Sequence, residues 1–221
     1  YDILLQASTE EEAGNIRTYN ALEILKHLQG SDTPDFVILS KIEFIYLPWM
    51  AEGATAEPKA IQYRLSNEPA YFCEMMELAY KPCHEEAPSK ELPSGVADRL
   101  FQLLYPYKVV PGTDWNGVFH PDRFAAWLEE VTVWARQTDR YEVTMQTVGN
   151  GLSYAAFDAA DVLEPAIMEA LNDPAQSQLR NGYRLGIHNQ RGVHYVDPEG
   201  KEEKALAEAF QRRASAVEAL G

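Results

Sequence analysis

The chain has 221 residues, of which 46% are hydrophobic and 24% charged, a composition typical of a globular protein and too apolar for a disordered one. Its formal net charge of −15 opposes binding to nucleic acid and to anionic membranes, because both attract proteins through positive charge. We therefore expect a protein partner, either a separate basic protein or another part of the parent chain, or no partner at all, and neither nucleic acid nor membrane.

Helical periodicity dominates the first half of the chain, where apolar residues recur every three or four positions. Thr33-Pro34-Asp35 is a start signal for a helix that runs from Phe36 to Tyr46, until Pro48 stops it. This helix is apolar on almost all sides, so we expect it at the centre of the fold. Further helices are expected over residues 19–28, 59–65, 69–79 and 96–104, whereas the proline-containing residues 81–95 predict a charged surface loop.

The second half of the chain continues the helical pattern. His120-Pro121 begins one helix, and residues 141–152, 161–171, 175–187 and 206–220 predict four more. About ten helices with short connections predict an all-α fold over residues 1–221, as a single helical domain or a repeat segment. We expect an irregular antiparallel helical repeat (solenoid-like) or, alternatively, a compact multi-helix domain. Since the chain lacks an initiator Met and its last helical pattern runs almost to Gly221, we expect a fragment of a longer chain.

Two segments rich in turn residues interrupt the helices. Residues 110–119, which include PGTDWNGV, predict an ordered loop anchored by Trp115. Asp114 does not begin a calcium loop, because Ala125 occupies the twelfth position, where a bidentate acid is required. Gly149-Asn150-Gly151 is interpreted as a break or bend in a helix. All four tryptophans are expected in the core: Trp49, Trp115, Trp127 and Trp134.

The segment 180–200, RNGYRLGIHNQRGVHYVDPEG, concentrates the side chains best suited to binding. If residues 175–187 are helical, Arg180, Arg184 and His188 are spaced four apart and share one face. A glycine-rich connection over residues 188–200 would then turn the chain back, with residues 193–196 as a candidate for extended backbone. The candidate patch consists of Arg180, Tyr183, Arg184, His188, Arg191, His194 and Tyr195.

Two interpretations of this candidate patch remain open. Its guanidinium groups could bind a phosphate, a carboxylate or an acidic peptide, because arginine matches the geometry of planar anions. Alternatively, the arginines neutralise the protein's own acidic residues in an internal network, and the sequence favours this second interpretation.

The sequence predicts no catalytic residue, no metal site and no cofactor. His188, His194 and Asp197 match no zinc spacing, and Cys73 on a helix with Cys83-His84 in a loop is poor geometry for a tetrahedral site. We find no nucleophile-elbow, zincin or dinucleotide-binding motif. The two cysteines are expected to be reduced thiols of a cytoplasmic protein.

Four segments together resemble the C-terminal helical region of large, poorly characterised bacterial multidomain proteins. They are ALEILKHLQG with IEFIYLPWM, EPAYFCEMMELAY, PGTDWNGVFHPDRFAAWLEEV and LRNGYRLGIHNQRGVHYVDPEGKEEKALAEAF, and they span residues 21–210. The resemblance implies a helical, cytoplasmic, C-terminal module attached to other domains, and by analogy alone a place in bacterial defence or signalling assemblies. It implies no catalytic residue.

The function expected from the sequence is a non-enzymatic helical scaffold or protein-interaction module of a larger bacterial protein. Its most specific contact would be the candidate patch within residues 180–195. The alternative is an enzyme or ligand sensor, whose anion pocket would be built from Arg184, His188, Arg191 and His194.

Overall fold

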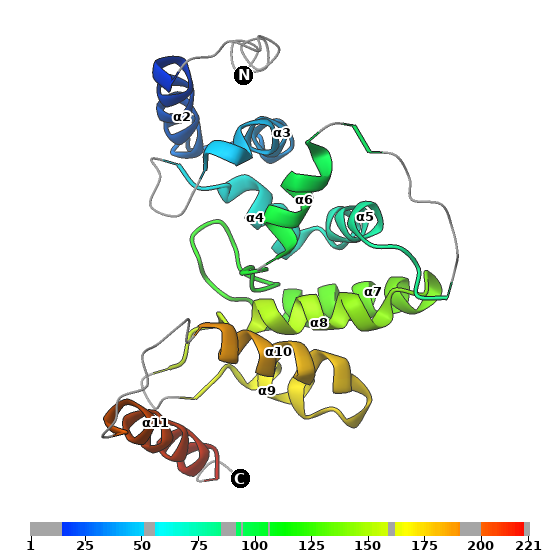
Figure 1. Cartoon of the computed structure of the whole chain (residues 1–221), viewed down its shortest axis with the longest axis vertical. Helices are drawn as coiled ribbons and strands as arrows, with labels where there is room; N and C mark the ends of the chain where they lie inside the picture. The colour runs from blue at the N-terminus through cyan, green and yellow to red at the C-terminus, as the bar shows by residue number, and fades with distance from the viewer. Residues whose placement is uncertain are drawn as a thin grey trace. The chain divides into compact units, whose positions relative to one another are not determined.

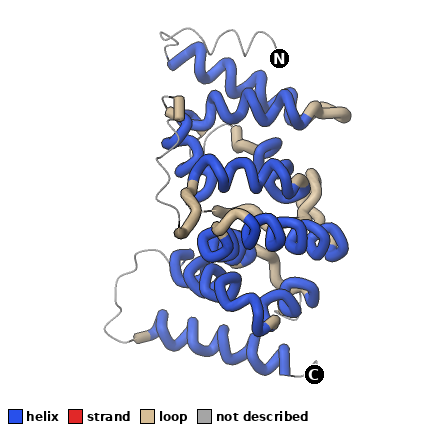
Figure 2. Tube along the Cα trace, turned by 90° about the vertical axis from the view of Figure 1, so that its right-hand side faces the viewer, coloured by secondary structure: helices blue, strands red, loops and turns tan. Residues whose placement is uncertain are grey.

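The computed structural model describes residues 15–50, 56–84, 92–93, 95–105, 107–158, 162–190 and 200–218. Within these ranges the chain forms ten α-helices and two short 3-10 helices, and its extended backbone pairs only in two isolated bridges, Thr113–Phe119 and Phe157–Leu163. Figure 2 shows the helices and the loops that join them. The prediction of an all-α fold with about ten helices is confirmed. The candidate extended backbone at residues 193–196 lies outside the described residues.

The chain divides into two compact units, Tyr1–Arg140 (unit 1) and Tyr141–Gly221 (unit 2). No proline- or glycine-rich linker marks this division, and the sequence predicts a single helical domain or a repeat segment instead. The helix that ends unit 1 is followed by a short turn in which Asp139 adopts the left-handed conformation, with a φ of 54°. Turns this short usually join helices of the same domain. The amino-acid composition therefore does not reveal the boundary between the two units.

In unit 1 each of the first four α-helices packs against the next α-helix in the chain (Figure 1). The helices of unit 1 are α2 (Asn15–Gln29), α3 (Phe36–Tyr46), η1 (Leu47–Trp49), α4 (Lys59–Asn67), α5 (Pro69–Ala79), α6 (Val96–Leu104) and α7 (Pro121–Gln137). Helix α7 returns to contact both α4 and α5. The predicted start signal of α3 is confirmed, because the Asp35 side chain accepts a hydrogen bond from the Ile38 amide at 3.0 Å.

The core of unit 1 follows the apolar faces of these helices. Leu25 of α2 packs with Leu39 and Ile42 of α3, and all three side chains are fully buried. Between α5 and α7, the ring of Phe72 lies 4.9 Å from that of Trp127, which is 2% exposed. Burying such side chains stabilises the fold by about 1.5–3 kcal/mol each.

Glu43 of α3 is a fully buried carboxylate where three helices meet. Its Oε1 accepts hydrogen bonds from Gln29 Nε2 of α2 at 2.7 Å and from the Ala60 amide at 2.9 Å, and its Oε2 accepts one from the Ile61 amide at 2.7 Å. These amides belong to the first turn of α4, which lacks acceptors of its own and favours an anion. Burial nevertheless raises the pKa of Glu43 to about 7.

The prediction that Trp49 lies in the core is wrong. It lies in the 3-10 helix η1 and is 49% exposed, with its ring 5.9 Å from that of Tyr46. The apolar run that precedes it suggests burial, but Pro48 ends the helical periodicity and turns the next side chain out of the core. Trp127 is buried as predicted, whereas Trp115 and Trp134 are half-buried.

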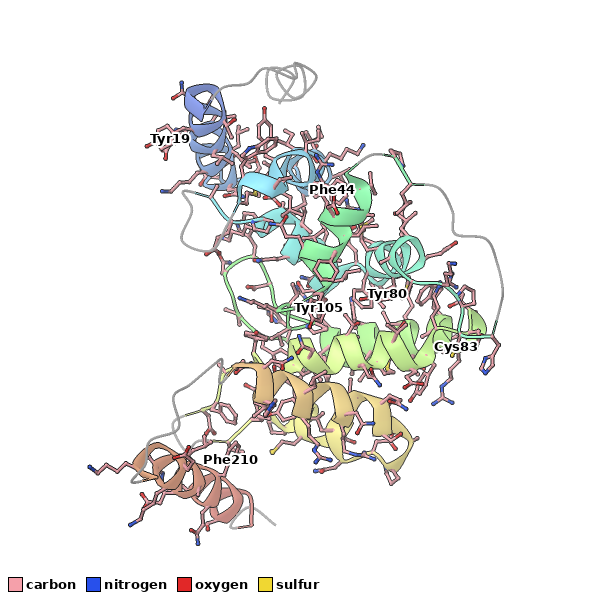
Figure 3. All side chains as sticks on the ribbon, in the orientation of Figure 1. Tyr19, Phe44, Tyr80, Cys83, Tyr105 and Phe210 are labelled. Atoms are coloured by element: carbon pink, nitrogen blue, oxygen red, sulfur yellow. The ribbon has the colours of Figure 1, made fainter. Side chains whose placement is uncertain are left out.

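Unit 2 consists of four α-helices and one 3-10 helix within its described residues. They are α8 (Tyr141–Leu152), α9 (Pro165–Asn172), η2 (Pro174–Gln176), α10 (Ser177–Gln190) and α11 (Lys201–Glu218). Helix α9 begins at Pro165 rather than at the predicted residue 161, because the preceding residues form the bridge between Phe157 and Leu163. Phe210 of α11 is 44% exposed, and it is labelled in Figure 3.

Helices α8 and α10 pack against each other through glycines. A Cβ added at Gly149 of α8 would lie 2.8 Å from the Tyr183 amide nitrogen, and one at Gly182 would lie 2.7 Å from Gln146 Cα. A Cβ at Gly186 would lie 2.7 Å from Ser153 Cβ. Gly149 therefore does not break the helix, because α8 continues to Leu152, and the glycine allows a second backbone to approach. The predicted alternative, a bend at Gly149-Asn150-Gly151, stays a prediction.

Candidate functional site

A cavity of about 540 Å³ lies in unit 1 between α4 and the segment 108–117. Helix α4 lines it with Lys59, Gln62, Tyr63 and Ser66, which are three or four residues apart and therefore share one face of the helix. The segment 108–117 supplies the other wall, which includes Lys108, Val109, Val110 and Trp115. This combination of a helix face and an ordered loop gives the cavity both apolar and polar sides, as is usual for binding sites.

Trp115 anchors the loop and also forms the aromatic wall of the cavity. Its ring centroid lies 5.0 Å from that of Phe36 and 5.9 Å from that of Tyr63, the latter at an edge-to-face angle of 85°. The Lys59 ammonium sits over the indole, 4.4 Å from the ring centroid, as in a cation–π contact. The prediction that Trp115 anchors residues 110–119 is thus confirmed.

Hydrogen bonds to α4 fix the position of the loop. The Thr113 carbonyl accepts bonds from Ser66 Oγ at 2.9 Å and from Asn67 Nδ2 at 2.7 Å, and the Gly112 amide donates to the Ser66 carbonyl at 2.8 Å. Gly112 has a φ of 82° and a Cβ there would lie 2.8 Å from Phe124 Cβ, so both the turn and the packing require glycine. The cavity wall is therefore held in place before any ligand arrives.

Asp114 organises the tip of the loop. Its Oδ1 accepts hydrogen bonds from the amides of Asn116 at 2.9 Å and Val118 at 3.0 Å, and its Oδ2 lies 2.9 Å from His120 Nε2. The bond from His120 and those from the two amides lower the pKa of Asp114 to about 2. Asp114 is thus an ionised carboxylate whose oxygens already have partners in the loop.

We expect Asp114→Ala to loosen the loop without unfolding unit 1. The substitution removes the acceptor for both amides, so their hydrogen exchange should accelerate about tenfold, the effect of losing one hydrogen bond. Exchange at buried amides of α7 serves as the internal control and should stay unchanged. Equal acceleration in the loop and in α7 would mean that Asp114 supports the whole unit and not the loop alone.

The patch predicted within residues 180–195 is described only in part. Arg180, Tyr183, Arg184 and His188 lie on α10, whereas Arg191, His194 and Tyr195 lie outside the described residues. Arg180 Nη1 donates to the carbonyls of Leu171, at 3.0 Å, and of Asp173, so its guanidinium caps the end of α9. Arg184 and His188 are exposed. Arg180 therefore binds the backbone of its own unit, while the patch as a whole, including the anion pocket, stays a prediction.

The first three residues of the predicted glycine-rich connection over residues 188–200 belong to a helix instead. His188, Asn189 and Gln190 continue α10, and Gln190 Nε2 donates to both the carbonyl and the Oγ of Ser153 at 2.8 Å. This bond ties the last turn of α10 to the end of α8, which local sequence patterns do not indicate. Residues 191–199 lie outside the described part of the chain.

Cys73, Cys83 and His84 are not assembled into a metal site. Cys73 is buried on α5, where desolvation raises the pKa of its thiol to about 12, whereas Cys83 is exposed (Figure 3). His84 Nδ1 lies 2.9 Å from Asp139 Oδ1, and this contact lowers the pKa of Asp139. Among the described residues, no group of three or more His, Cys, Asp and Glu side chains could hold a metal ion.

The cavity was not among the predicted sites. The sequence contains one signal for it, a tryptophan inside a turn-rich loop, but that signal fits a core anchor equally well. The approach of the loop to one face of α4 depends on hydrogen bonds between residues 46 and 47 positions apart, which no local pattern reveals.

In the described part of the chain, no helix combines the length and the apolar composition needed to cross a membrane. Comparisons of the chain with protein-family models, with curated protein sequences and with solved structures found no match. The resemblance to bacterial multidomain proteins therefore stays a prediction, and the function has to be argued from the geometry of the cavity.

Proposed function

We propose that this chain is a non-enzymatic helical interaction module, in which unit 1 holds a segment of a partner protein in the cavity between α4 and residues 108–117. The observation that carries this proposal is the half-buried Trp115, which forms one wall of a cavity of about 540 Å³. Tryptophan and tyrosine dominate the binding energy of protein interfaces, and both line this cavity. The volume is in the range of about 300–1,000 Å³ that accommodates ligands and side-chain anchors.

The rigidity of the cavity supports the same proposal. Trp115 packs against Phe36 and Tyr63, and the loop that carries it is bonded to Ser66 and Asn67 of α4. A wall that is already ordered loses little conformational entropy when a partner binds, which leaves more of the contact energy for affinity. The two free cysteines fit the proposed cytoplasmic location, since free thiols persist in reducing compartments.

A second exposed feature favours an interaction role. Phe101 and Tyr105 stack at the end of α6 with ring centroids 5.0 Å apart, and they are 63% and 61% exposed (Tyr105 is labelled in Figure 3). Large exposed aromatic side chains on one helix are typical of interaction surfaces. This pair would offer a partner a second contact surface on unit 1.

Selection from a random peptide library tests the proposal. The bait is the full chain, compared with Gln62→Trp, which fills the cavity from α4, and with Gln137→Trp, a matched change at an exposed position of α7. We expect enriched peptides that bind the unaltered chain and Gln137→Trp equally and bind Gln62→Trp at least about tenfold more weakly, because the bulky indole removes the anchor pocket. Peptides that bind all three proteins equally would contradict the proposal.

A further inference from the structure

We propose that a proton on Glu43 controls the cavity, because the first turn of α4 lies between the Glu43 carboxyl and the cavity. The ionised carboxylate holds this turn in the position that binds a partner, and the protonated carboxyl releases part of it. This inference rests on the proposed function and adds the regulation of the same site. Its consequence is that the affinity for a partner rises with pH.

The first turn of α4 faces Glu43 on one side and the cavity on the other. The amides of Ala60 and Ile61 donate to the Glu43 carboxylate at 2.9 and 2.7 Å, and the side chains of both residues are fully buried. Lys59, the residue before this pair, lines the cavity instead. Its ammonium lies 4.4 Å from the centroid of the Trp115 ring, so a shift of the turn changes the contact between the two walls of the cavity.

A proton on Glu43 disrupts this arrangement, because its three hydrogen-bond partners in the described part of the chain are all donors. Oε1 accepts from Gln29 Nε2 and the Ala60 amide, and Oε2 accepts from the Ile61 amide. A protonated carboxyl carries an O–H group, which is a donor itself and would meet an N–H group at either oxygen. Protonation at Oε2 costs one bond and not two, so we expect the Ile61 amide to be released.

Burial places the titration of Glu43 close to neutral pH. The carboxyl is fully buried, and desolvation raises its pKa to about 7, although its three hydrogen bonds act in the opposite direction. Protonation removes the cost of burying a charge and so favours the fold as a whole, while the first turn of α4 loses a bond. Because partner binding favours the ionised state, it lowers the pKa of Glu43, and the affinity falls as the pH falls through about 7.

Histidine is the other side chain that changes charge near neutral pH, so the histidines around these elements have to be separated from Glu43. His27 lies in the last turn of α2 and is exposed, and His120 Nε2 lies 2.9 Å from Asp114 Oδ2 in the loop wall of the cavity. Tyr71 of α5 stays neutral, because burial raises its pKa to about 12. Lysine, arginine and glutamate side chains at the surface keep their charge near neutral pH, and those around the junction are Lys26, Glu57, Lys59, Arg64, Glu74 and Arg99.

The full chain without a partner provides the first test. It is labelled with fluorotryptophan and nitrogen-15, and the Trp115 resonance is assigned from a Trp115→Phe variant. We expect the Trp115 fluorine resonance and the Ile61 amide resonance to move together, with one midpoint near pH 7. Glu43→Gln should remove both movements, whereas the controls His27→Gln and His120→Gln should keep them.

Three results of this titration would overturn the inference. If the Ile61 amide titrates while the Trp115 resonance stays in place, the effect of the proton does not reach the cavity. If the Trp115 titration survives Glu43→Gln, or disappears in His120→Gln, another group causes it. The unaltered chain and the histidine variants decide the question even if Glu43→Gln does not fold.

A library-selected peptide with blocked termini and no histidine then measures the affinity. We expect the unaltered chain to bind it about fivefold more tightly at about pH 8 than at about pH 6, the effect of strengthening one hydrogen bond, and Glu43→Gln to bind it equally at both. Equal affinities of the unaltered chain, with Trp115 still shifted by the peptide, would refute the inference and leave the interaction module standing. Failure to select any peptide that needs the cavity would refute the proposed function and the inference with it.

Discussion

Replacing Glu43 by alanine is expected to destabilise unit 1 by about 3–5 kcal/mol, because it leaves the Ala60 and Ile61 amides buried without an acceptor. Gln29 Nε2 would keep its bond to the Glu57 carbonyl but lose its bond to the carboxylate. Since small domains are stable by only about 5–15 kcal/mol, such a loss removes a large part of the total. Denaturant unfolding, followed by circular dichroism, measures the change.

The matched control for this experiment is Glu77→Ala, at an exposed position of α5. Surface substitutions away from caps and networks change stability by about 0.5 kcal/mol or less. Equal midpoints for the two variants would show that Glu43 does not hold α2, α3 and α4 together. If the unfolding curve shows two transitions and Glu43→Ala lowers the midpoint of only one of them, units 1 and 2 unfold separately.

Glu43 also predicts an unusual dependence of stability on pH. Burial raises the pKa of Glu43 from 4.5 to about 7, so between these pH values the folded protein binds more protons than the unfolded one. The contribution of Glu43 to stability is therefore greatest below pH 4.5 and falls as the pH rises to about 7, by on the order of 3 kcal/mol. Glu43→Gln removes this titration, so the difference in unfolding free energy between protein and variant should narrow or reverse over that window. A difference in unfolding free energy that stays constant with pH would contradict the raised pKa of Glu43.

Replacing Gly182 by alanine is expected to destabilise unit 2 by about 2–3 kcal/mol, although alanine is the better helix former. Helix propensity alone would favour alanine by about 1 kcal/mol. The added Cβ, however, would meet the Gln146 backbone, with its Cα at 2.7 Å and its carbonyl oxygen closer still. Backbone atoms of a packed helix cannot move aside as a flexible side chain can, so α8 and α10 must separate and lose contacts along their length.

The control for Gly182→Ala is Asn189→Ala, an exposed position on the same helix. This change should be neutral or slightly stabilising, because it improves helix propensity and removes no contact with α8. Adding Gly149→Ala to Gly182→Ala should cost less than the sum of the two single changes, since both push the same helices apart. Full additivity would indicate two independent local distortions. A thermal melt of each variant decides between these outcomes.

The sequence predicted elements best where periodicity and end signals coincide. The expected ranges of α6 and α8 agree with the structure at both ends, because their apolar stripes begin and stop abruptly. Asp35 and Pro121 mark the starts of α3 and α7 for the same reason. These signals are local, so they need no knowledge of the tertiary structure.

The features that the sequence did not predict depend on contacts between distant residues. Glu43 is a single acid in an apolar helix. Only the packing of α4 against this helix shows that the Glu43 carboxylate accepts hydrogen bonds from the first turn of α4. A glycine such as Gly149 looks the same in the sequence whether it bends its helix or allows a neighbouring helix to pack closely. The cavity likewise exists because the side chains of Ser66 and Asn67 donate hydrogen bonds to the Thr113 carbonyl. Nothing in the sequence distinguishes Ser66 or Asn67 from other polar residues.

The most direct test of the interaction module is fluorine NMR of the Trp115 side chain while a library-selected peptide is titrated into the full chain. Trp127, which is buried between α5 and α7, provides an internal reference in the same spectrum. We predict that the Trp115 resonance shifts in proportion to the bound fraction while that of Trp127 stays in place. Saturable binding that leaves the Trp115 resonance unmoved would place the partner elsewhere and contradict the proposed function of the cavity.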